Sequence, residues 1–230
     1  HNLLLIEKTK DDKETHFYAN ETIAKGWSRD LLLNAIKLDS YHQTQKSVPS
    51  HNFDTALSLA HAEYANEVFK SSYNLGFLGI TESIKELELE KRLIAKISTF
   101  ILELGKGFTF IGNQYRLEYN RKEYFVDMLF FHRGLQALVA IDLKIGSFKA
   151  GYIGKMNLYL SLLDKLEKGE TENQSIGIIL CADKDHLDVE IALQDINKPI
   201  GVAECQLLLP KEALQTMVLN ELNAAVQENE

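Results

Sequence analysis

Two aspartates in apolar, strand-like segments are the residues of this sequence best suited to chemistry. Asp127 lies within the run 124–131, and Asp142 follows the run 138–141, two residues before Lys144. A carboxylate in an apolar strand costs folding free energy unless a partner compensates it. Because side chains alternate across a strand, Asp142 and Lys144 share one face. Two carboxylates and a lysine at strand ends suit a divalent metal that activates water for attack on a phosphodiester.

Structural roles for the same residues stay open at this point. Asp142 and Lys144 can form a surface ion pair, which contributes little stability, and Asp127 can cap or pair within the fold. The sequence shows no histidine spacing typical of a zinc protease, no catalytic serine or cysteine pattern and no glycine-rich phosphate loop. Cys181 and Cys205 lie in apolar runs, and we expect buried thiols there.

The composition is that of a folded protein with a substantial core. Of the 230 residues 45% are hydrophobic, and no secretory signal is evident, so we expect a cytoplasmic protein. No apolar run approaches the roughly 18 residues of a membrane helix. The net charge of -8 argues against a nucleic-acid partner, but residues 105–160 hold eight basic and four acidic residues. The candidate residues therefore lie in a basic part of the chain, although ordinary solvated charge also explains this excess.

Two helices are expected to flank the candidate strands. Apolar periodicity predicts a long helix over 82–104, and Glu90 points along its inward stripe. A solvated helix start is the alternative explanation of this glutamate. A second helix is expected at about 152–167, where Lys155 and Tyr159 share one face because they are four residues apart. A simple core role is the alternative for the tyrosine.

The strand pattern predicts the fold class. Short strands are expected near 108–112, 114–119, 124–132 and 136–144. The continuous apolar run 175–181 predicts a strand buried on both faces, and another strand is expected at 200–204. A closing helix is expected at 211–228. This order predicts an α/β sandwich around a central mixed sheet flanked by helices.

Residues 1–75 are expected to form a helical N-terminal region, and 76–230 a second domain. Ser28 is a suitable N-cap for a helix at 31–38. A helical pattern also covers 53–73. The first residue is not methionine, which favours a fragment of a longer protein.

Seven ordered segments carry a resemblance to a known family. They are Phe-Ile-Leu-Glu-Leu-Gly-Lys-Gly-Phe (100–108), Ile-Gly-Asn-Gln-Tyr (111–115), Phe-Val-Asp-Met-Leu-Phe-Phe-His (125–132), Ile-Asp-Leu-Lys-Ile-Gly (141–146), Gly-Lys-Met-Asn-Leu-Tyr-Leu (154–160), Ser-Ile-Gly-Ile-Ile-Leu-Cys (175–181) and Pro-Ile-Gly-Val-Ala-Glu (199–204). Through them, residues 82–210 resemble the C-terminal nuclease domain of the YhcG-type family, a branch of the PD-(D/E)XK superfamily. Residues 1–75, with Gly-Trp-Ser-Arg at 26–29, resemble the trailing part of that family's helix-turn-helix-like N-terminal domain, which is thought to contact DNA.

The resemblance implies a restriction-endonuclease-like fold and Mg²⁺-dependent cleavage of nucleic acid, with DNA the expected substrate and Mn²⁺ an alternative metal. Asp127 and Asp142 correspond to the motif's two acids, Lys144 to its lysine, and Glu90 to the helical acid of the superfamily core. In the expected mechanism the two aspartates and the main-chain carbonyl of Leu143 hold the metal, which acidifies a bound water. The lysine orients that water and stabilises charge on phosphorus. Glu90 would hold a second metal or its water shell.

Further residues are implied as contacts to substrate. Lys155 and Tyr159 lie where related nucleases place a basic or amide residue and a tyrosine, and Gln114 lies on a strand expected to reach the same cleft. Glu103 is the alternative to the helical acid named above. One departure from the family is Asp142, where a glutamate is usual, and the shorter side chain retracts the carboxylate.

Two other functions fit the same fold. A binding module with an impaired site would tolerate the shorter acid, and a scaffold or dimerisation protein would use the long helices instead. A homodimer is left open. DNA binding that depends on salt, together with cleavage that depends on metal, separates these functions from a nuclease.

Overall fold

The computed structural model describes residues 1–42, 50–80 and 84–207. Its elements divide between two compact units. The first consists of the described residues within 1–47, 72–106 and 205–230, and the second of those within 48–71 and 107–204. Within the described ranges, no helix is long and apolar enough to cross a membrane. The domain boundary expected near residue 75 stays a prediction.

The first unit is mainly helical. Its elements are α1 (Asn2–Lys8), α2 (Asp12–Lys25), α3 (Arg29–Lys37), β2 (Ser72–Asn74), the 3-10 helix η1 (Gly76–Leu78), α7 (Glu86–Ala95) and α8 (Ile97–Leu104). Tyr18, Trp27 and Leu32 are buried in a core formed by the first three helices. Ser28 Oγ accepts a hydrogen bond from the amide of Leu31 at 3.2 Å, which confirms the expected N-cap.

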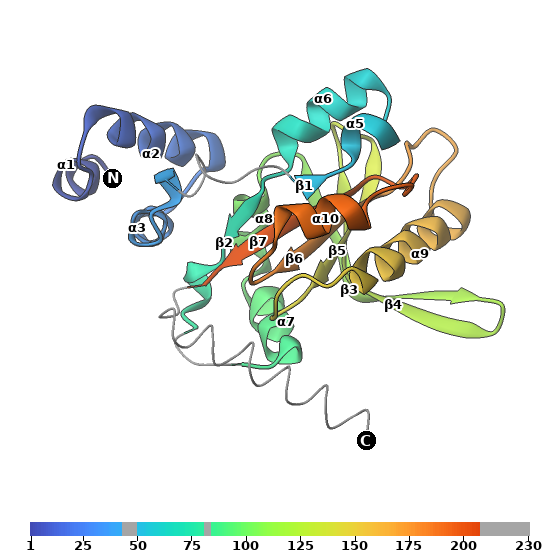
Figure 1. The fold of residues 1–230 in the computed structure, drawn as a ribbon. Coiled ribbons are helices and arrows are strands. Elements are labelled where there is room, and N and C mark those ends of the chain that lie inside the picture. The colour runs from blue at the N-terminus through green and yellow to red at the C-terminus, as the bar shows by residue number, and fades with distance from the viewer. Residues whose placement is uncertain (43–49, 81–83, 208–230) are drawn as a thin grey trace. The chain divides into compact units, whose positions relative to one another are not determined.

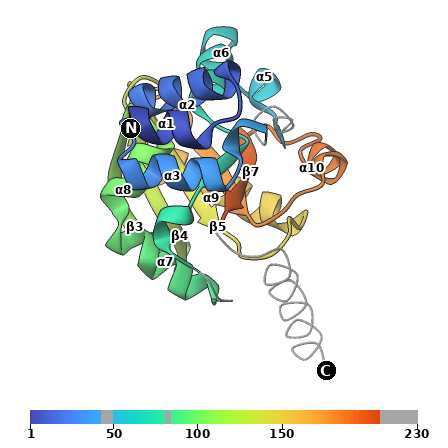
Figure 2. The same cartoon turned by 90° about the vertical axis from the view of Figure 1, so that its left-hand side faces the viewer.

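The single helix expected over 82–104 is wrong, and residues 82 and 83 lie outside the described residues. The chain bends at Lys96, so that α7 and α8 are separate helices (Figure 2). The Lys96 amide donates to the carbonyls of both Arg92 and Leu93, at 3.2 and 3.1 Å, which tightens the last turn of α7. Apolar periodicity cannot reveal such a break, because both helices keep an inward apolar face.

The second unit is formed around a mixed sheet (Figure 1). Its strands are β1 (Ser50–His51), β3 (Phe108–Tyr119), β4 (Lys122–His132), β5 (Ala137–Leu143), β6 (Ile176–Cys181) and β7 (Ile200–Gln206). They lie in the order β1-β7-β6-β5-β4-β3. β5, β6 and β7 run parallel, whereas the pairs β3–β4, β4–β5 and β1–β7 are antiparallel. The expected α/β fold with a central mixed sheet is confirmed.

Individual strand expectations had different outcomes. The apolar run at 175–181 forms β6, which is buried along its whole length between two parallel neighbours, as expected. The two short strands expected within 108–119 are one strand, β3, with a bulge between Phe110 and Gly112. Cys181 and Cys205 are buried, as expected. The closing helix expected at 211–228 lies outside the described residues.

Among the described residues, four helices belong to the second unit: α5 (Phe53–Ala56), α6 (Leu59–Val68), α9 (Gly151–Leu166) and, after β6, the short α10 (His186–Ala192). Of these, α9 matches the helix expected at 152–167. The continuous helical pattern expected over 53–73 is wrong, because the backbone is extended at Leu57 and again at Phe69. Strand β2 then begins at Ser72.

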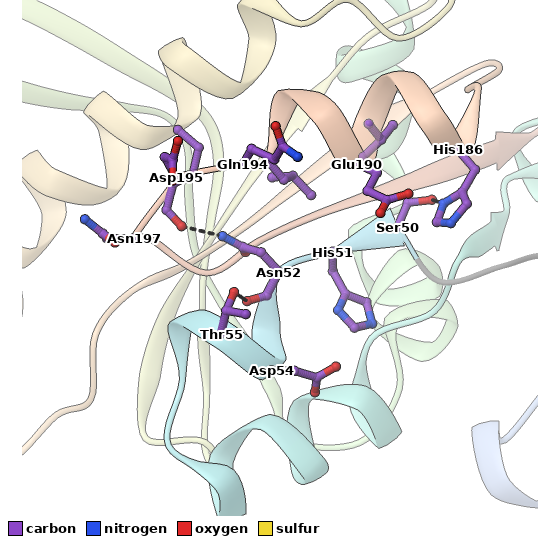
Figure 3. A pocket seen from close by; sticks show the side chains of 13 residues that line it. Ser50, His51, Asn52, Asp54, Thr55, His186, Glu190, Gln194, Asp195 and Asn197 are labelled. Carbon is purple, nitrogen blue, oxygen red and sulfur yellow. Dashed lines mark hydrogen bonds between the residues drawn. The ribbon is translucent and has the colours of Figure 1, made fainter.

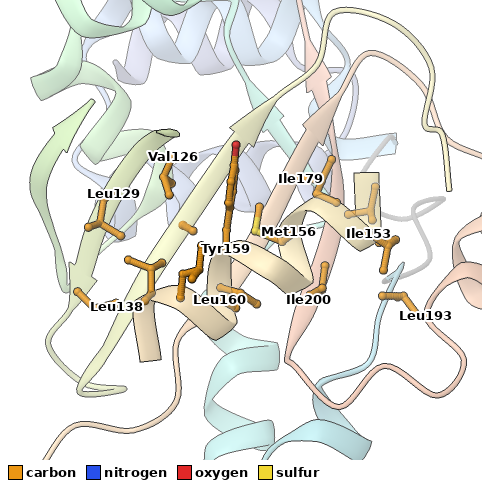
Figure 4. Packing of buried hydrophobic residues seen from close by; sticks show 14 of the residues in the cluster. Val126, Leu129, Leu138, Ile153, Met156, Tyr159, Leu160, Ile179, Leu193 and Ile200 are labelled. Atoms are coloured by element: carbon orange, nitrogen blue, oxygen red, sulfur yellow. The ribbon is translucent and has the colours of Figure 1, made fainter. Parts of the chain in front are cut away.

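Helix α9 packs closely on the parallel strands. Met156 and Leu160 of α9 and Ile179 of β6 are buried in one cluster (Figure 4). Gly177 of β6 permits this approach, since a Cβ added there would lie 2.5 Å from Met156 Cγ and 3.2 Å from Leu160 Cδ1. The helix is therefore held against β5 and β6, and β5 carries the candidate acid Asp142.

Candidate functional site

Asp142, the penultimate residue of β5, is a buried carboxylate with two lysine partners. Its Oδ2 lies 2.9 Å from Lys144 Nζ, and its Oδ1 accepts a hydrogen bond from Lys155 Nζ at 3.1 Å. The side chain of Asp142 is only 2% exposed, that of Lys144 9% and that of Lys155 42%. Asp142 and Lys144 are therefore close together, and the ion pair left open as an alternative is present, but it is buried and does not lie on the surface.

Asp127 lies on the adjacent strand β4. It comes one residue before Met128, which pairs with Ile141 of β5. Its Oδ2 accepts a hydrogen bond from the Leu143 amide at 2.9 Å and lies 3.9 Å from Lys144 Nζ. Burial, and next the nearby Asp142 carboxylate, raise the pKa of Asp127 from 3.8 to about 7. The Leu143 amide and the two lysines oppose this rise only in part. The carboxyl group therefore lies where additional positive charge would favour its ionised form.

The oxygen atoms expected to hold a metal surround a single ammonium group. Lys144 Nζ donates to the main-chain carbonyl of Leu143 at 2.6 Å, in addition to its contacts with the carboxylates of Asp142 and Asp127. Two carboxylates and a carbonyl are the hard oxygen donors that Mg²⁺ prefers, so the donor set fits such an ion. Within the described ranges, no group of three or more histidine, cysteine, aspartate or glutamate side chains is arranged to hold a metal. Water would have to complete the coordination.

Helix α9 contributes Lys155 and Tyr159 to the same place. They share a face as expected, with Lys155 Nζ 5.2 Å from the centroid of the Tyr159 ring. The tyrosine is only 6% exposed and belongs to the cluster beneath α9 (Figure 4), so the core role left open for it is confirmed. Lys144 Nζ lies 5.5 Å from the ring centroid of Tyr152 on the same helix. Both ammonium groups are thus held between carboxylates and aromatic rings.

Gln114 lies on β3 beside Asp127. The register pairs Asn113 with Met128 and Tyr115 with Val126, which leaves Gln114 and Asp127 opposite one another. Gln114 is exposed and has a positive φ of 44°, which is uncommon for a residue with a side chain. Backbone strain of this kind concentrates at functional sites.

The two glutamates expected as helical acids belong to the first unit. Glu90 on α7 is buried, with 7% of its surface exposed, and its role in metal binding stays a prediction. Glu103 on α8 is also buried, and its Oε1 accepts a hydrogen bond from the Asn74 amide at 3.0 Å. The alternative acid, Glu103, therefore has a structural partner in its own unit.

A pocket of about 470 Å³ was not anticipated from the sequence (Figure 3). Residues of β1, α5, α10 and the segment after α10 line this pocket. His51, His186 and Glu190 are among the lining residues, and none of the expected site residues is. His186 Nδ1 lies 3.2 Å from Ser50 Oγ, and burial lowers the pKa of His51. Long-range pairing creates this pocket: Asn52 binds the backbone of residues 196, 198 and 200, far away in the sequence.

Known proteins resemble this chain over most of its length. A family model described as the YhcG PDDEXK nuclease domain matches residues 66–221. The chain is 32% identical over 230 residues to a protein of Escherichia coli (strain K12) named "Putative nuclease YhcG", covering 98% of this chain and 60% of that protein. The chain therefore spans less than two thirds of the length of this relative.

Two solved structures also match, each over 56% of this chain. They are a repair endonuclease from Pyrococcus abyssi, with 17% identity, a TM-score of 0.36 and 50% of that chain covered, and EndoMS in apo form, with 15% identity, a TM-score of 0.35 and 48% covered.

Proposed function

This chain belongs to the YhcG PDDEXK nuclease family, and we propose that it hydrolyses phosphodiester bonds in DNA with the help of a divalent metal, Mg²⁺ or Mn²⁺. One observation carries the proposal. The carboxylates of Asp127 and Asp142 and the carbonyl of Leu143 converge on a single cationic group, Lys144 Nζ, at 3.9, 2.9 and 2.6 Å. A site that already gathers three oxygen donors around a positive charge is suited to a hard cation.

Asp127, Asp142 and the carbonyl of Leu143 would hold the ion. When bound, it would lower the pKa of a coordinated water and withdraw charge from the scissile phosphate. Lys144 would then orient the attacking water and stabilise the negative charge that develops on the phosphate oxygens. Its compact ammonium suits this role, since the planar guanidinium of arginine has a different shape and donor geometry.

The charge balance of the site also favours a phosphodiester. Without metal, the ammonium groups of Lys144 and Lys155 face two carboxyl groups, and one of these, Asp127, has a pKa near neutrality. A divalent ion would make the site net positive, which attracts the phosphate backbone. Lys155 is partly exposed, so its ammonium is available to a substrate, and Gln114 of β3 is exposed opposite Asp127.

Cleavage of supercoiled plasmid DNA in Mg²⁺ or Mn²⁺ tests the proposal. Asp127→Asn keeps an acceptor for the Leu143 amide, and Lys144→Met keeps the length of the side chain but removes its charge. We expect each to lower the cleavage rate by about 100-fold or more, whereas Lys91→Met, at an exposed position of α7, should cleave at the rate of the unmodified protein. Circular dichroism and thermal unfolding would check that the variants are folded.

Other outcomes would identify a different function. Undiminished cleavage by Lys144→Met would contradict the proposed role of that lysine. Salt-sensitive DNA binding by the unmodified protein, without cleavage in either metal, would favour a binding module with an impaired site, and Asp142→Glu would then be the variant that restores activity. No DNA binding at all would favour a scaffold.

A further inference from the structure

A two-stranded ribbon extends from the sheet next to the two aspartates. β3 and β4 pair continuously from Asn113–Met128 to Tyr119–Lys122, whereas β5 pairs with β4 only from Met128 to His132. Among the described residues, no further strand therefore lies beside the outer half of the β3–β4 hairpin, and Figure 1 shows it projecting past α9. Asp127 lies at the point where the ribbon leaves the sheet. A ligand held along the ribbon would be delivered to that carboxylate.

The turn of the ribbon places an arginine in an unfavourable backbone conformation. Asn120 and Arg121 both have positive φ, 52° and 60°, as in the type I′ turn that joins strands with their natural twist. Asparagine and glycine are the residues preferred in this turn, because most side chains clash in the left-handed region. Asn120 follows that preference and Arg121 does not. Local strain retained at an exposed tip indicates that the arginine side chain has a use there.

The charges of the ribbon separate into an ion-paired group, in which one arginine faces two glutamates and one negative charge remains, and two cations at the turn. Arg116 lies between Glu118 and Glu123, at 2.7 and 2.6 Å. Among the residues that the structure describes, neither Arg121 nor Lys122 has an ion-pair partner.

A third cation joins these two at the same end of the ribbon. Lys165 of α9 lies there, where its Nζ donates to the Tyr119 hydroxyl at 3.0 Å. We call Arg121, Lys122 and Lys165 the ribbon tip.

We propose that the ribbon tip binds the phosphate backbone of double-stranded DNA and holds the duplex over Asp127 and Asp142. This inference rests on the proposed nuclease function and adds to it how the substrate is positioned. Extended strands rise by about 3.3 Å per residue, so Arg121 and Asp127 are about 20 Å apart along β4. That length corresponds to about six nucleotides of a B-form strand. The tip would therefore contact the backbone about half a helical turn from the bond that is cleaved.

The ribbon favours duplex DNA over other nucleic acids. The major groove of B-DNA is about 12 Å wide and admits a two-stranded ribbon, whereas the deep, narrow groove of A-form RNA does not. Binding of single strands relies on exposed aromatic faces that stack with bases. Tyr119 and Phe125 are exposed on the ribbon. Tyr119 is a poor platform of that kind, because Lys165 Nζ lies over its ring, 4.7 Å from the centroid, and Phe125 by itself offers a face for one base and not for successive bases.

Equilibrium binding measures this role without requiring cleavage. Fluorescence anisotropy with a labelled duplex of about 30 base pairs would be recorded in EDTA at several salt concentrations. Arg121→Gln and Lys122→Gln should each weaken binding about fivefold at 0.15 M salt and reduce the slope of log K against log salt by about 0.9, the value for one lost phosphate contact. Arg121→Gly should weaken binding equally but not lower the melting temperature, since glycine accepts the turn conformation.

The matched control is Arg133→Gln, which removes the same charge from the turn at the opposite end of β4. It should change neither affinity nor slope. If Arg133→Gln and Arg121→Gln lowered the affinity for DNA equally, the proposal would be overturned, because the change in net charge would then explain both losses of affinity. Unchanged binding by both ribbon variants would also overturn it, and so would a loss seen only with single-stranded DNA of the same length.

The result is separable from the outcome for the nuclease function. If the ribbon variants bind normally and plasmid cleavage by the unmodified protein is intact, the ribbon proposal fails and the nuclease proposal stands. If the ribbon variants lose affinity but no metal supports cleavage, the ribbon tip binds duplex DNA as proposed and the nuclease proposal fails. A protein that binds no duplex DNA would refute both.

Discussion

Replacing Asp127 with asparagine should stabilise the metal-free protein at pH 8 while abolishing cleavage. The cause is the pKa of this carboxyl, which burial and then the Asp142 carboxylate raise from 3.8 to about 7. Below pH 3.8 the group is protonated in both the folded and the unfolded protein and has no effect on stability. Between pH 3.8 and 7 it ionises in the unfolded protein but not in the folded one, so the free energy of unfolding falls as pH rises. Above pH 7 the loss is complete.

The size of the effect follows from the same shift. One pH unit corresponds to about 1.4 kcal/mol, so a rise of about three units sets an upper limit of about 4 kcal/mol. We expect about 2 kcal/mol, because relaxation and water around the exposed edge of the side chain reduce the cost of a buried charge. Asparagine keeps an acceptor for the Leu143 amide, which donates to Asp127 Oδ2 at 2.9 Å, but carries no charge to desolvate. For a chain of this size, the melting temperature should rise by about 4–8 °C at pH 8.

Thermal and urea unfolding of both proteins in EDTA, at pH 4 and at pH 8, would measure the difference. The stabilisation should be large at pH 8 and nearly absent at pH 4. In excess Mn²⁺ at pH 8 the unmodified protein should become more stable than the variant, since the metal would stabilise the unmodified protein and not the variant. An asparagine variant that is less stable than the unmodified protein in EDTA at pH 8, or a difference independent of pH, would refute the reasoning.

Two further predictions concern packing and helix capping. Gly177→Ala should lower the free energy of unfolding by about 1–3 kcal/mol, because the new Cβ would lie 2.5 Å from Met156 Cγ; Gly154→Ala, in open space on α9, should instead raise it by about 1 kcal/mol. Equal urea midpoints for the two variants would contradict this packing. Ser28→Ala should cost about 1 kcal/mol by removing the acceptor of the Leu31 amide, whereas Ser58→Ala removes no such cap and should cost little. Similar melting temperatures for the two serine variants would show that the cap is unimportant.

Local patterns in the sequence predicted most of the central sheet and its main helix. Alternating and continuous apolar runs gave β4, β5 and β6 within a few residues, and the four-residue spacing of Lys155 and Tyr159 placed both on one face of α9. These elements were predictable because side-chain periodicity depends only on residues that are close together in the sequence. The same reasoning failed at Lys96 and within 53–73, where the backbone breaks although the apolar pattern continues.

Elements that are too short to show an apolar repeat, and features that depend on pairing between distant strands, were not predictable in this way. Strand β1 has two residues, and it exists because Ser50 and His51 pair with Val202 and Gly201 of β7. The pocket between β1, α5 and α10 depends on that pairing (Figure 3). The projecting ribbon likewise depends on where β5 stops pairing with β4, which the separate strands do not reveal.

The amino-acid sequence alone determined which residues bear charge within apolar strands, and hence that Asp127, Asp142 and Lys144 are the candidates for chemistry. Only the tertiary structure decided that Asp142 is buried between two lysines and that the Leu143 carbonyl joins Asp127 around one ammonium. The reason is physical: strand pairing and the packing of α9 on Gly177 bring together residues that are distant in the chain. Desolvation then sets the pKa of Asp127, and no local pattern of residues encodes how much water a side chain loses.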